Sequence, residues 1–146
     1  MGRGGGAVSI IDAHTHVQFP VFDSDRSEVI ARAKKAGVGM ILVGTQGMTS
    51  QAAIELARKD LKFMRATVGY HPNHADESWH HDSKEQIASR PEPFDAKFFL
   101  ELAEKPEVVA IGECGLDYYR LKQSAERQAH IGRQKEIFRA QIEIAE

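Results

Sequence analysis

The amino-acid sequence predicts an α/β fold built on a parallel sheet. Short apolar runs alternate along the chain with segments whose apolar residues recur at helical spacing. Alternating strands and helices are typical of parallel sheets, and a continuous apolar run is typical of a strand buried on both faces. These runs also end at polar residues or glycine, as strands do where they enter a loop. We therefore expect about four strand–helix units.

Each predicted strand is a short apolar run that closes at a polar or glycine-containing turn. The four runs are residues 8–12, 38–43, 63–70 and 107–113. The last run reads EVVAIGE, and its continuous apolar stretch predicts a strand buried on both faces.

The predicted helices lie between and after these strands, and each begins at a residue type that caps helix N-termini. The glycine that follows the first helix is its expected stop. The expected capping residues are, in chain order, Asp25, Thr49 or Ser50, Asp95 and Ser124. Glu28 is spaced from Asp25 as in a capping box, and the stop of the first helix is Gly37.

A long polar segment, residues 73–93, separates the third strand from the third helix. Loops of this length in a compact domain are often functional. Its histidines His74, His80 and His81 suggest a further metal site. Because the neighbours His80 and His81 point in divergent directions in an extended chain, exposed loop histidines are favoured over that site. Trp79 and Tyr70 are candidates either for stacking on the bases of single-stranded nucleic acid or for partly buried anchors of the loop.

Composition and charge describe a globular protein. Hydrophobic residues make up 42% of the chain and charged residues 27%, and the formal net charge of −2 gives no bulk attraction for nucleic acid. No apolar run approaches the roughly 20 residues that span a bilayer, so we expect no membrane partner. We expect a cytoplasmic protein, with the nucleus as the alternative. Residues 1–7 are expected to be a flexible lead that precedes a domain at residues 8–146.

Candidate metal ligands follow two of the predicted strands. His14 and His16 come just past the end of the first strand, and their spacing of two turns both imidazoles to the same side. Neutral imidazoles are good ligands for zinc and its first-row neighbours. Glu113 ends the fourth strand, where a carboxylate is costly unless a cation or hydrogen bonds compensate it. Asp12 is expected either to orient a ligand or to stabilise the turn through backbone bonds.

Four separate motifs then point to a known family. They are DAHTH at residues 12–16, VGYHP at 68–72, GECGLDY at 112–118 and ERQ at 126–128. With these motifs in this order, the chain resembles the TatD-like deoxyribonucleases, which are metal-dependent hydrolases built on a TIM barrel. The resemblance implies a TIM-barrel-type metallohydrolase fold, whose reactive groups lie at the carboxyl ends of the strands. Because such a barrel typically needs about 250 residues, we expect the N-terminal portion, a truncated or half barrel.

The resemblance implies that the protein hydrolyses phosphodiester bonds of DNA through a metal-activated water. It implies that His14, His16 and Glu113 hold one or two Zn, Mn or Mg ions, with Glu113 serving one ion or bridging two. Glu113 is accordingly expected to take part in catalysis.

Three further residues have expected roles near this rim. His71 is expected to act in catalysis by contacting the substrate phosphate or the attacking water, while packing beside Pro72 explains it equally well. Asp117 is expected either to bond a ligand histidine or to pin the turn after Gly115. For Arg120, a place on a solvated helix surface is favoured, although Arg120 is also close enough to the rim to bind a phosphate. For Cys114, a packing role is favoured over a metal ligand or a reactive thiol.

Two other functions stay open. The family completes its site with two further histidines and an aspartate from later strands, so the chain is also compatible with a catalytically silent half-barrel that acts as an assembly partner. Another metallohydrolase with an Asp-x-His-x-His strand end, an amidohydrolase or a phosphatase, is the second alternative. Because four parallel strands leave open edges, we expect self-association, pairing with a complementary half-barrel, or marginal stability.

Overall fold

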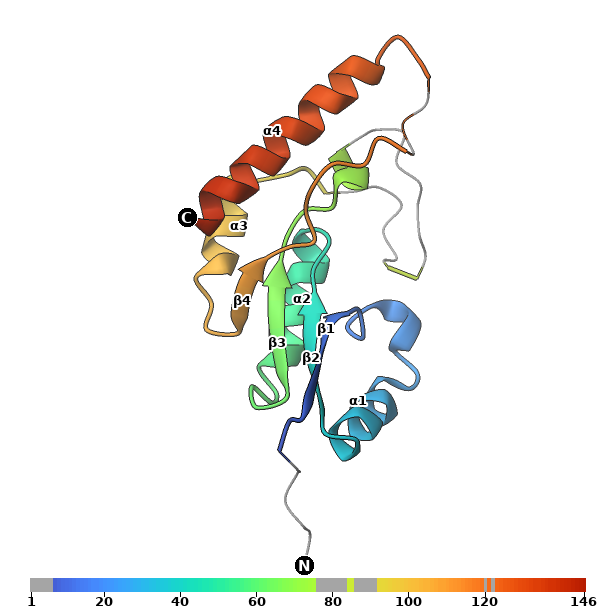
Figure 1. Cartoon of the computed structure of the whole chain (residues 1–146), viewed down its shortest axis with the longest axis vertical. Helices are drawn as coiled ribbons and strands as arrows, with labels where there is room; N and C mark the ends of the chain where they lie inside the picture. Colours follow the sequence, from blue (N-terminus) through green and yellow to red (C-terminus); the bar gives the residue numbers. More distant parts are fainter. Residues whose placement is uncertain (1–6, 76–83, 86–91, 120, 122) are drawn as a thin grey trace, which may run out of the picture.

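The computed structural model describes residues 7–75, 84–85, 92–119, 121 and 123–146 of the chain. Four parallel strands form one sheet in the order β1-β2-β3-β4, which is also their order in the sequence. The strands are β1 (Ile10–Thr15), β2 (Val38–Val43), β3 (Met64–Val68) and β4 (Val108–Ile111). This arrangement confirms the expected α/β fold with four strand–helix units (Figure 1).

The helices connect and follow these strands. They are α1 (Arg26–Lys35), α2 (Gly47–Ala57), α3 (Ala96–Ala103) and α4 (Arg127–Ala145), with two short 3-10 helices, η1 (Pro20–Phe22) and η2 (Pro72–Ala75). Figure 1 shows α4 lying beyond the arrowheads of β3 and β4, on the side of the sheet to which the carboxyl ends of the strands point.

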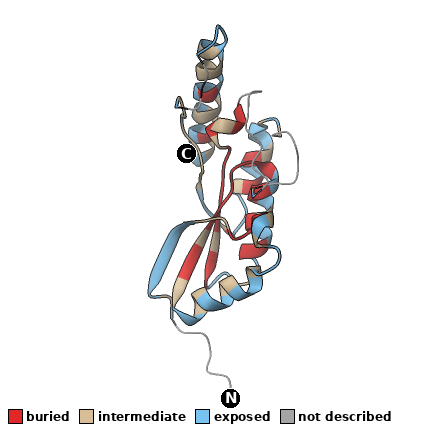
Figure 2. Ribbon diagram, turned by 90° about the vertical axis from the view of Figure 1, so that its right-hand side faces the viewer, coloured by how far each residue is buried: buried red, intermediate tan, exposed pale blue. Residues whose placement is uncertain are grey.

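The core lies between the two middle strands and the helices α2 and α3. Alternate residues of β2 and β3, such as Leu42 and Ala66, pack against Ile54 of α2 and Phe99 of α3. Figure 2 shows the buried residues concentrated in the middle of the sheet and in the helix packed on it. Burial of these apolar side chains supplies the main driving force for this layer.

The outer strands are much more exposed than the sequence predicts. Ile10 and Ile11 of β1 are 65% and 60% exposed, and Val109 of β4 is 53% exposed. The prediction that residues 107–113 form a strand buried on both faces was therefore wrong: β4 covers only Val108–Ile111 and has a single neighbouring strand. Val109 and Ala110 are exposed and Val108 and Ile111 are only partly buried, so neither face of this strand is fully covered.

Asp25 is the N-cap residue of α1, as predicted, but the predicted start of α2 was wrong. The side chain of Asp25 makes no capping hydrogen bond in α1, although its carbonyl accepts the first helical bonds. α2 begins at Gly47, because Gln46 and Thr49 bond each other's main chain in a capping box. Thr49 is thus the third residue of the helix, and its hydroxyl also accepts a bond from the Thr45 N–H at 2.8 Å.

Other boundaries agree more closely with the sequence. Asp95 caps α3 by accepting bonds from the N–H groups of Lys97 and Phe98, as expected. Gly37 ends α1 with a φ of +71°, a conformation that glycine adopts without steric cost. α4 begins at Arg127 rather than near Ser124.

The polar segment 73–93 is described only in part. Trp79, His80, His81 and most of the helical turn expected near residues 84–88 lie outside the described residues, as do residues 1–6 of the expected lead. Tyr70 is 3% exposed and packs against Phe94 and Phe99. Tyr70 is therefore a buried anchor, and the idea that it stacks on bases was wrong.

Candidate metal centre

Two histidines and a glutamate converge at the carboxyl ends of β1 and β4. His14 lies within β1, His16 follows it, and Glu113 lies just after β4. One ligand atom from each residue can be chosen so that all three atoms lie within 4.8 Å of one another. The closest approaches are 3.1 Å between the two Nε2 atoms and 3.2 Å from His14 Nε2 to Glu113 Oε2. His16 Nε2 lies 3.8 Å from the same oxygen.

Asp12 shapes the main chain that presents the histidines. Its Oδ1 accepts a hydrogen bond from the His14 N–H at 3.2 Å, and the register between β1 and β2 shifts between Asp12 and Thr15. Thr15 donates from its hydroxyl to the Ile41 carbonyl at 2.9 Å. Of the two roles left open for Asp12, this bond corresponds to stabilisation of the backbone. β1 extends to Thr15, which pairs with Leu42 of β2, instead of ending at Asp12.

The imidazole of His16 is oriented by a main-chain acceptor. Its Nδ1 lies 2.9 Å from the Val43 carbonyl, and its ring stacks on Phe19 with centroids 4.4 Å apart. Since a carbonyl can only accept, Nδ1 donates, and in the neutral ring Nε2 keeps a lone pair directed toward His14 and Glu113. Burial lowers the pKa of His16, which favours this neutral, ligand-competent form.

Glu113 is held by the strand ends beneath it. Its N–H donates to the Gly44 carbonyl at 2.9 Å, and the Gly112 N–H donates to Val68 at 2.9 Å. The main chain at Gly112 lies so close to Gly69 that a Cβ at Gly69 would overlap it. Glycine at position 69 is thus a requirement of this close approach between the segments after β3 and β4.

His71 contacts Oε1 of Glu113, the carboxylate oxygen that does not face His14 and His16. Its Nδ1 accepts a hydrogen bond from the Asn73 N–H at 3.1 Å, so the proton of the neutral ring is on Nε2. Nε2 lies 3.3 Å from Glu113 Oε1, to which it can donate. This contact is the main reason that the pKa of Glu113 falls to about 2. In this arrangement His71 acts as a hydrogen-bond donor rather than a metal ligand.

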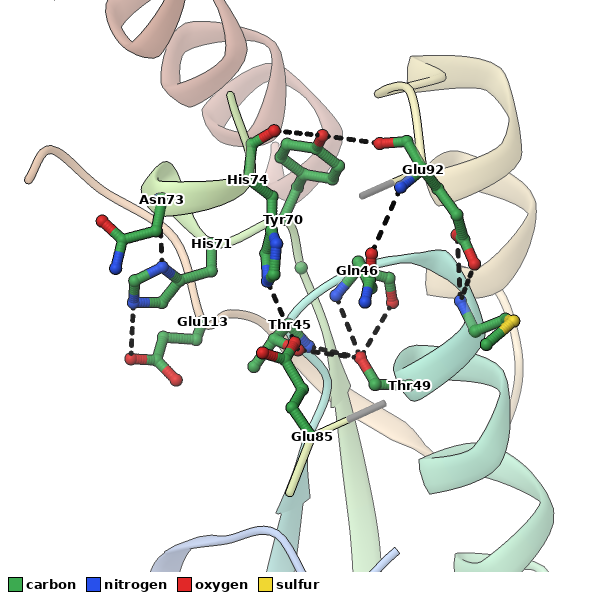
Figure 3. A network of polar contacts seen from close by, with 12 residues as sticks. Thr45, Gln46, Thr49, Tyr70, His71, Asn73, His74, Glu85, Glu92 and Glu113 are labelled. Carbon is green, nitrogen blue, oxygen red and sulfur yellow. Dashed lines mark hydrogen bonds and ion pairs between the residues drawn. The ribbon is translucent and has the colours of Figure 1, made fainter. Parts of the chain in front are cut away.

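A polar network beside His71 was not foreseen from the sequence. Its member His74 is 4% exposed, so the expectation of an exposed loop histidine was wrong at this position. Glu85 contacts the Thr45 hydroxyl and lies 2.9 Å from His74 Nε2, while the Tyr70 hydroxyl bonds the carbonyls of His74 and Glu92 (Figure 3). Burial alone would raise the pKa of Glu85, but the bonds from its neighbours outweigh burial and lower it. The network joins the end of β2 to η2, and no local sequence pattern signals it.

The remaining predicted residues lie further along the loop after β4. Asp117 accepts a bond from the Tyr119 N–H at 3.0 Å through its carboxylate, which corresponds to the turn-pinning alternative. Arg120 lies outside the described residues. Cys114 is half-buried, and burial raises the pKa of its thiol. Its sulfur is not part of the three-residue cluster found among the described residues.

The donor set fits a divalent metal ion. Two imidazole nitrogens and a carboxylate oxygen are the ligands preferred by zinc and manganese, and three protein ligands leave coordination positions open. The hydrogen bond to the Val43 carbonyl orients the imidazole of His16. Because His71 contacts Oε1 of Glu113, the other oxygen, Oε2, faces the two clustered histidines. These features are those of oriented ligands around a shared position.

The comparison with known families is decisive at this point. Residues 11–146 match the family of TatD-related DNases. The chain belongs to this family. The match covers the four motifs identified in the sequence and confirms the resemblance.

Curated TatD relatives are similar over most of this chain. The 3'-5' ssDNA/RNA exonuclease TatD of Erwinia tasmaniensis is 42% identical over 125 residues, covering 85% of this chain and 41% of that protein. The protein of the same name from Salmonella typhimurium is 40% identical over 125 residues, covering 85% and 40%. The chain therefore spans about two fifths of the length of these relatives.

Solved TatD structures share the fold. The structure of YjjV, a TatD homologue of Escherichia coli K12, superposes with a TM-score of 0.67 at 26% identity, covering 94% of this chain and 47% of that one. A TatD family hydrolase from Entamoeba histolytica gives a TM-score of 0.62, covering 91% and 44%. The parallel sheet with alternating helices is thus part of a TIM-barrel-type fold, as expected. Within the described residues, none of the helices is both long enough and apolar enough to cross a membrane.

Proposed function

We propose that this chain, as a TatD-type domain portion at residues 8–146, forms part of a metal-dependent nuclease site that hydrolyses phosphodiester bonds of single-stranded DNA. The observation that supports this most directly is the convergence of His14, His16 and Glu113 within 4.8 Å. The relatives named 3'-5' ssDNA/RNA exonuclease TatD supply the substrate class.

In this proposal the three clustered residues hold one divalent ion, or two with Glu113 between them, and zinc, manganese or magnesium is the candidate. A divalent ion in such a site supplies the Lewis acidity that polarises a phosphate oxygen and activates water near neutral pH. The protein contributes the orientation of His16 through Val43 and the placement of Glu113 through Gly44.

His71 is proposed to act on the substrate as a hydrogen-bond donor. Its proton is held on Nε2 by the bond that Nδ1 accepts from Asn73. A phosphate oxygen that reaches the site can take the place of Glu113 Oε1 as acceptor, because an imidazole N–H donates to either anion. Arg120 is proposed as a second phosphate contact, from its position three residues after Asp117.

The experiment is a nuclease assay on the purified full chain. Single-stranded oligonucleotides labelled at either end are incubated with Mg²⁺, Mn²⁺ or Zn²⁺, and the shortening from each end is followed. We expect metal-dependent shortening from the 3' end and a loss of about 100-fold or more in Glu113→Gln. The control is Glu101→Gln, because Glu101 is an exposed carboxylate on α3.

Three outcomes would count against the proposal. They are turnover that is equal in Glu113→Gln and Glu101→Gln, turnover without metal, and an absence of turnover with all three ions. Hydrolysis of cyclic amides or phosphomonoesters instead of DNA would favour an amidohydrolase-like or phosphatase-like activity on the same ligands.

The exposed edge strands favour a second candidate, an assembly role. Ile10, Ile11 and Val109 present apolar surface on β1 and β4. Such surface is protected when another sheet edge or a covering layer packs on it, so a second copy or a complementary half-barrel is the proposed occupant. Light scattering on the peak from size-exclusion chromatography is expected to give the mass of a dimer or a larger species. The Ile11→Lys variant is expected to have a lower mass, closer to that of the monomer. A monomeric wild-type chain with a steep cooperative melt would contradict this candidate.

A further inference from the structure

The two fully buried side chains of α4 are glutamines. Gln134 is 2% exposed and Gln141 is 1% exposed, and they are the buried residues of this 19-residue helix. They lie seven positions apart and so occupy one helix face, together with Ile137 and Ile144, which pack on the core. Apolar residues normally fill such positions, so two buried amides there call for a specific partner.

Both glutamines form hydrogen bonds with the main chain of a loop that follows a strand of the sheet. Gln141 accepts a bond from the Tyr70 N–H at 2.7 Å and donates to the Tyr70 carbonyl at 3.1 Å. Gln134 accepts from the Asp117 N–H at 2.8 Å and donates to the Asp117 carbonyl at 3.0 Å. Each side-chain amide thus pairs with both polar groups of one residue, as the main chain of a neighbouring strand does.

The two paired residues stand next to the candidate site. Tyr70 directly precedes His71, whose N–H donates to the Thr45 carbonyl at 2.8 Å. Asp117 belongs to the loop after β4, which also contains Glu113. α4 therefore bonds one loop that bears the histidine donor and another that bears its carboxylate acceptor. Figure 1 shows the helix beyond the carboxyl ends of the strands, on the same side of the sheet as the segments that leave β3 and β4.

We propose that Gln141 and Gln134 are positioning residues that hold these two loops at the separation at which His71 donates to Glu113. The sheet fixes the strand ends up to the bond from Gly112 N–H to Val68 and the bond from Glu113 N–H to Gly44. Beyond those bonds the chain leaves the sheet, and each loop is held instead by the two hydrogen bonds that one glutamine amide of α4 makes with its main chain. Spacing of the two glutamines along α4 then sets the spacing of the loops.

Replacement by glutamate tests this role with little change in shape. A carboxylate can still accept from the Tyr70 or Asp117 N–H, but it cannot donate to the carbonyl beside it. Gln128→Glu is the matched control, because Gln128 lies exposed on the same helix and undergoes the same charge change.

The first measurement is long-range ¹H–¹⁵N NMR of the histidines in the metal-free full chain at neutral pH, with His71→Gln used for assignment. In the wild type and in Gln128→Glu we expect the His71 pattern of a single Nε2–H tautomer. In Gln141→Glu we expect that pattern to change to a mixture of the two tautomers. A cooperatively folded Gln141→Glu protein with the wild-type His71 pattern would overturn the proposal.

The second measurement covers the Glu113 loop and the case in which Gln141→Glu does not fold. Calorimetric titration with Mn²⁺ is expected to show about 10-fold weaker binding in Gln134→Glu than in Gln128→Glu. Equal affinities in the two variants would overturn the proposal. Unfolding of both buried variants would also overturn it, because the glutamines would then support the whole fold rather than the two loops.

The catalytic meaning of this inference rests on the proposed nuclease function, but its test does not. The tautomer of His71 is observed without turnover, so the role of the glutamines can be measured even in a chain that fails the nuclease assay. Conversely, an active chain with an unchanged tautomer in Gln141→Glu retains the proposed function and loses this inference.

Discussion

The imidazole of His71 contacts only one of the two carboxylate oxygens of Glu113 within the described residues. Nε2 of His71 lies 3.3 Å from Oε1 of Glu113, while the other oxygen of the carboxylate faces His14 and His16. One oxygen is thus bonded within the protein and the other is directed toward the two imidazoles. This arrangement gives His71 and the two clustered histidines different chemical roles.

Replacing His71 tests its effect on the carboxylate. In metal-free protein, His71→Gln is expected to raise the pKa of Glu113 from about 2 by roughly 1, because the largest cause that lowers it is removed. The measurement is the pH dependence of the Glu113 carboxyl ¹³C shift. A lowered carboxyl pKa stabilises the fold above the ordinary value of 4.5, and this stabilisation is lost as the pH falls through the folded value. The acid-induced loss should therefore be smaller in the variant and should end at a higher pH. An unchanged ¹³C midpoint would contradict the assigned contact.

Metal binding is expected to stabilise the fold. Mn²⁺ or Zn²⁺ at about 100 times its dissociation constant should add roughly 2.7 kcal/mol to the free energy of unfolding, and EDTA should remove that gain. His16→Gln should abolish the gain, while His130→Gln on α4 should keep it. Because protons compete for the imidazoles, the gain should shrink as the pH falls below the ordinary histidine value of 6.5, and the lowered pKa of His16 delays this loss. A gain that is equal in both variants would place the ion elsewhere.

Glycine at position 69 should be essential for the geometry of Glu113. Gly69→Ala is expected to cost about 1–3 kcal/mol of unfolding free energy, because the added Cβ overlaps the main chain of Gly112. Gly132→Ala is the matched control: apart from the nearby main chain of α4 itself, no described atom lies within 4 Å of the added Cβ, and we expect a gain of about 0.5–1 kcal/mol. Denaturant unfolding of both variants measures whether the free energy of unfolding falls in Gly69→Ala and rises in Gly132→Ala. Equal changes in the two variants would contradict the close approach between Gly69 and Gly112.

The pair of Arg58 and Glu107 should contribute to stability in a pH-dependent way. Glu107 is 3% exposed, and Arg58 Nε donates to its Oε1 at 2.6 Å, which holds the pKa of this carboxyl below its usual value. Arg58→Met should destabilise the fold at neutral pH, because it leaves a buried carboxylate without this partner. A lowered carboxyl pKa gives stability that is present above about pH 4.5 and is lost as the pH falls through the folded value.

The difference between the Arg58→Met variant and the wild type should accordingly narrow in acid. Urea melts at neutral pH and below about pH 4 measure that difference. Lys59→Met, which removes an exposed cation from the next position, serves as the control. A difference that stays constant across this range would show that the charge of Glu107 is not involved.

Local sequence pattern was enough to predict the alternation of strands and helices and the three side chains that cluster in the candidate site. Both depend on local pattern: apolar runs mark the strands, and His14, His16 and Glu113 stand at or just beyond strand ends, which parallel pairing brings to one edge of the sheet. The cap at Asp95 and the stop at Gly37 were predicted for the same reason, because each depends on its immediate neighbours.

The tertiary structure alone decided how the site is held. The start of α2 at Gly47 depends on the side chain of Gln46, and the tautomer of His71 depends on a main-chain donor at Asn73. The bonds between Gln141 and Tyr70 join residues 71 positions apart. A side-chain amide has the same composition whether it faces water or a main-chain partner, so only the packing of α4 over the loops reveals which of these it bonds.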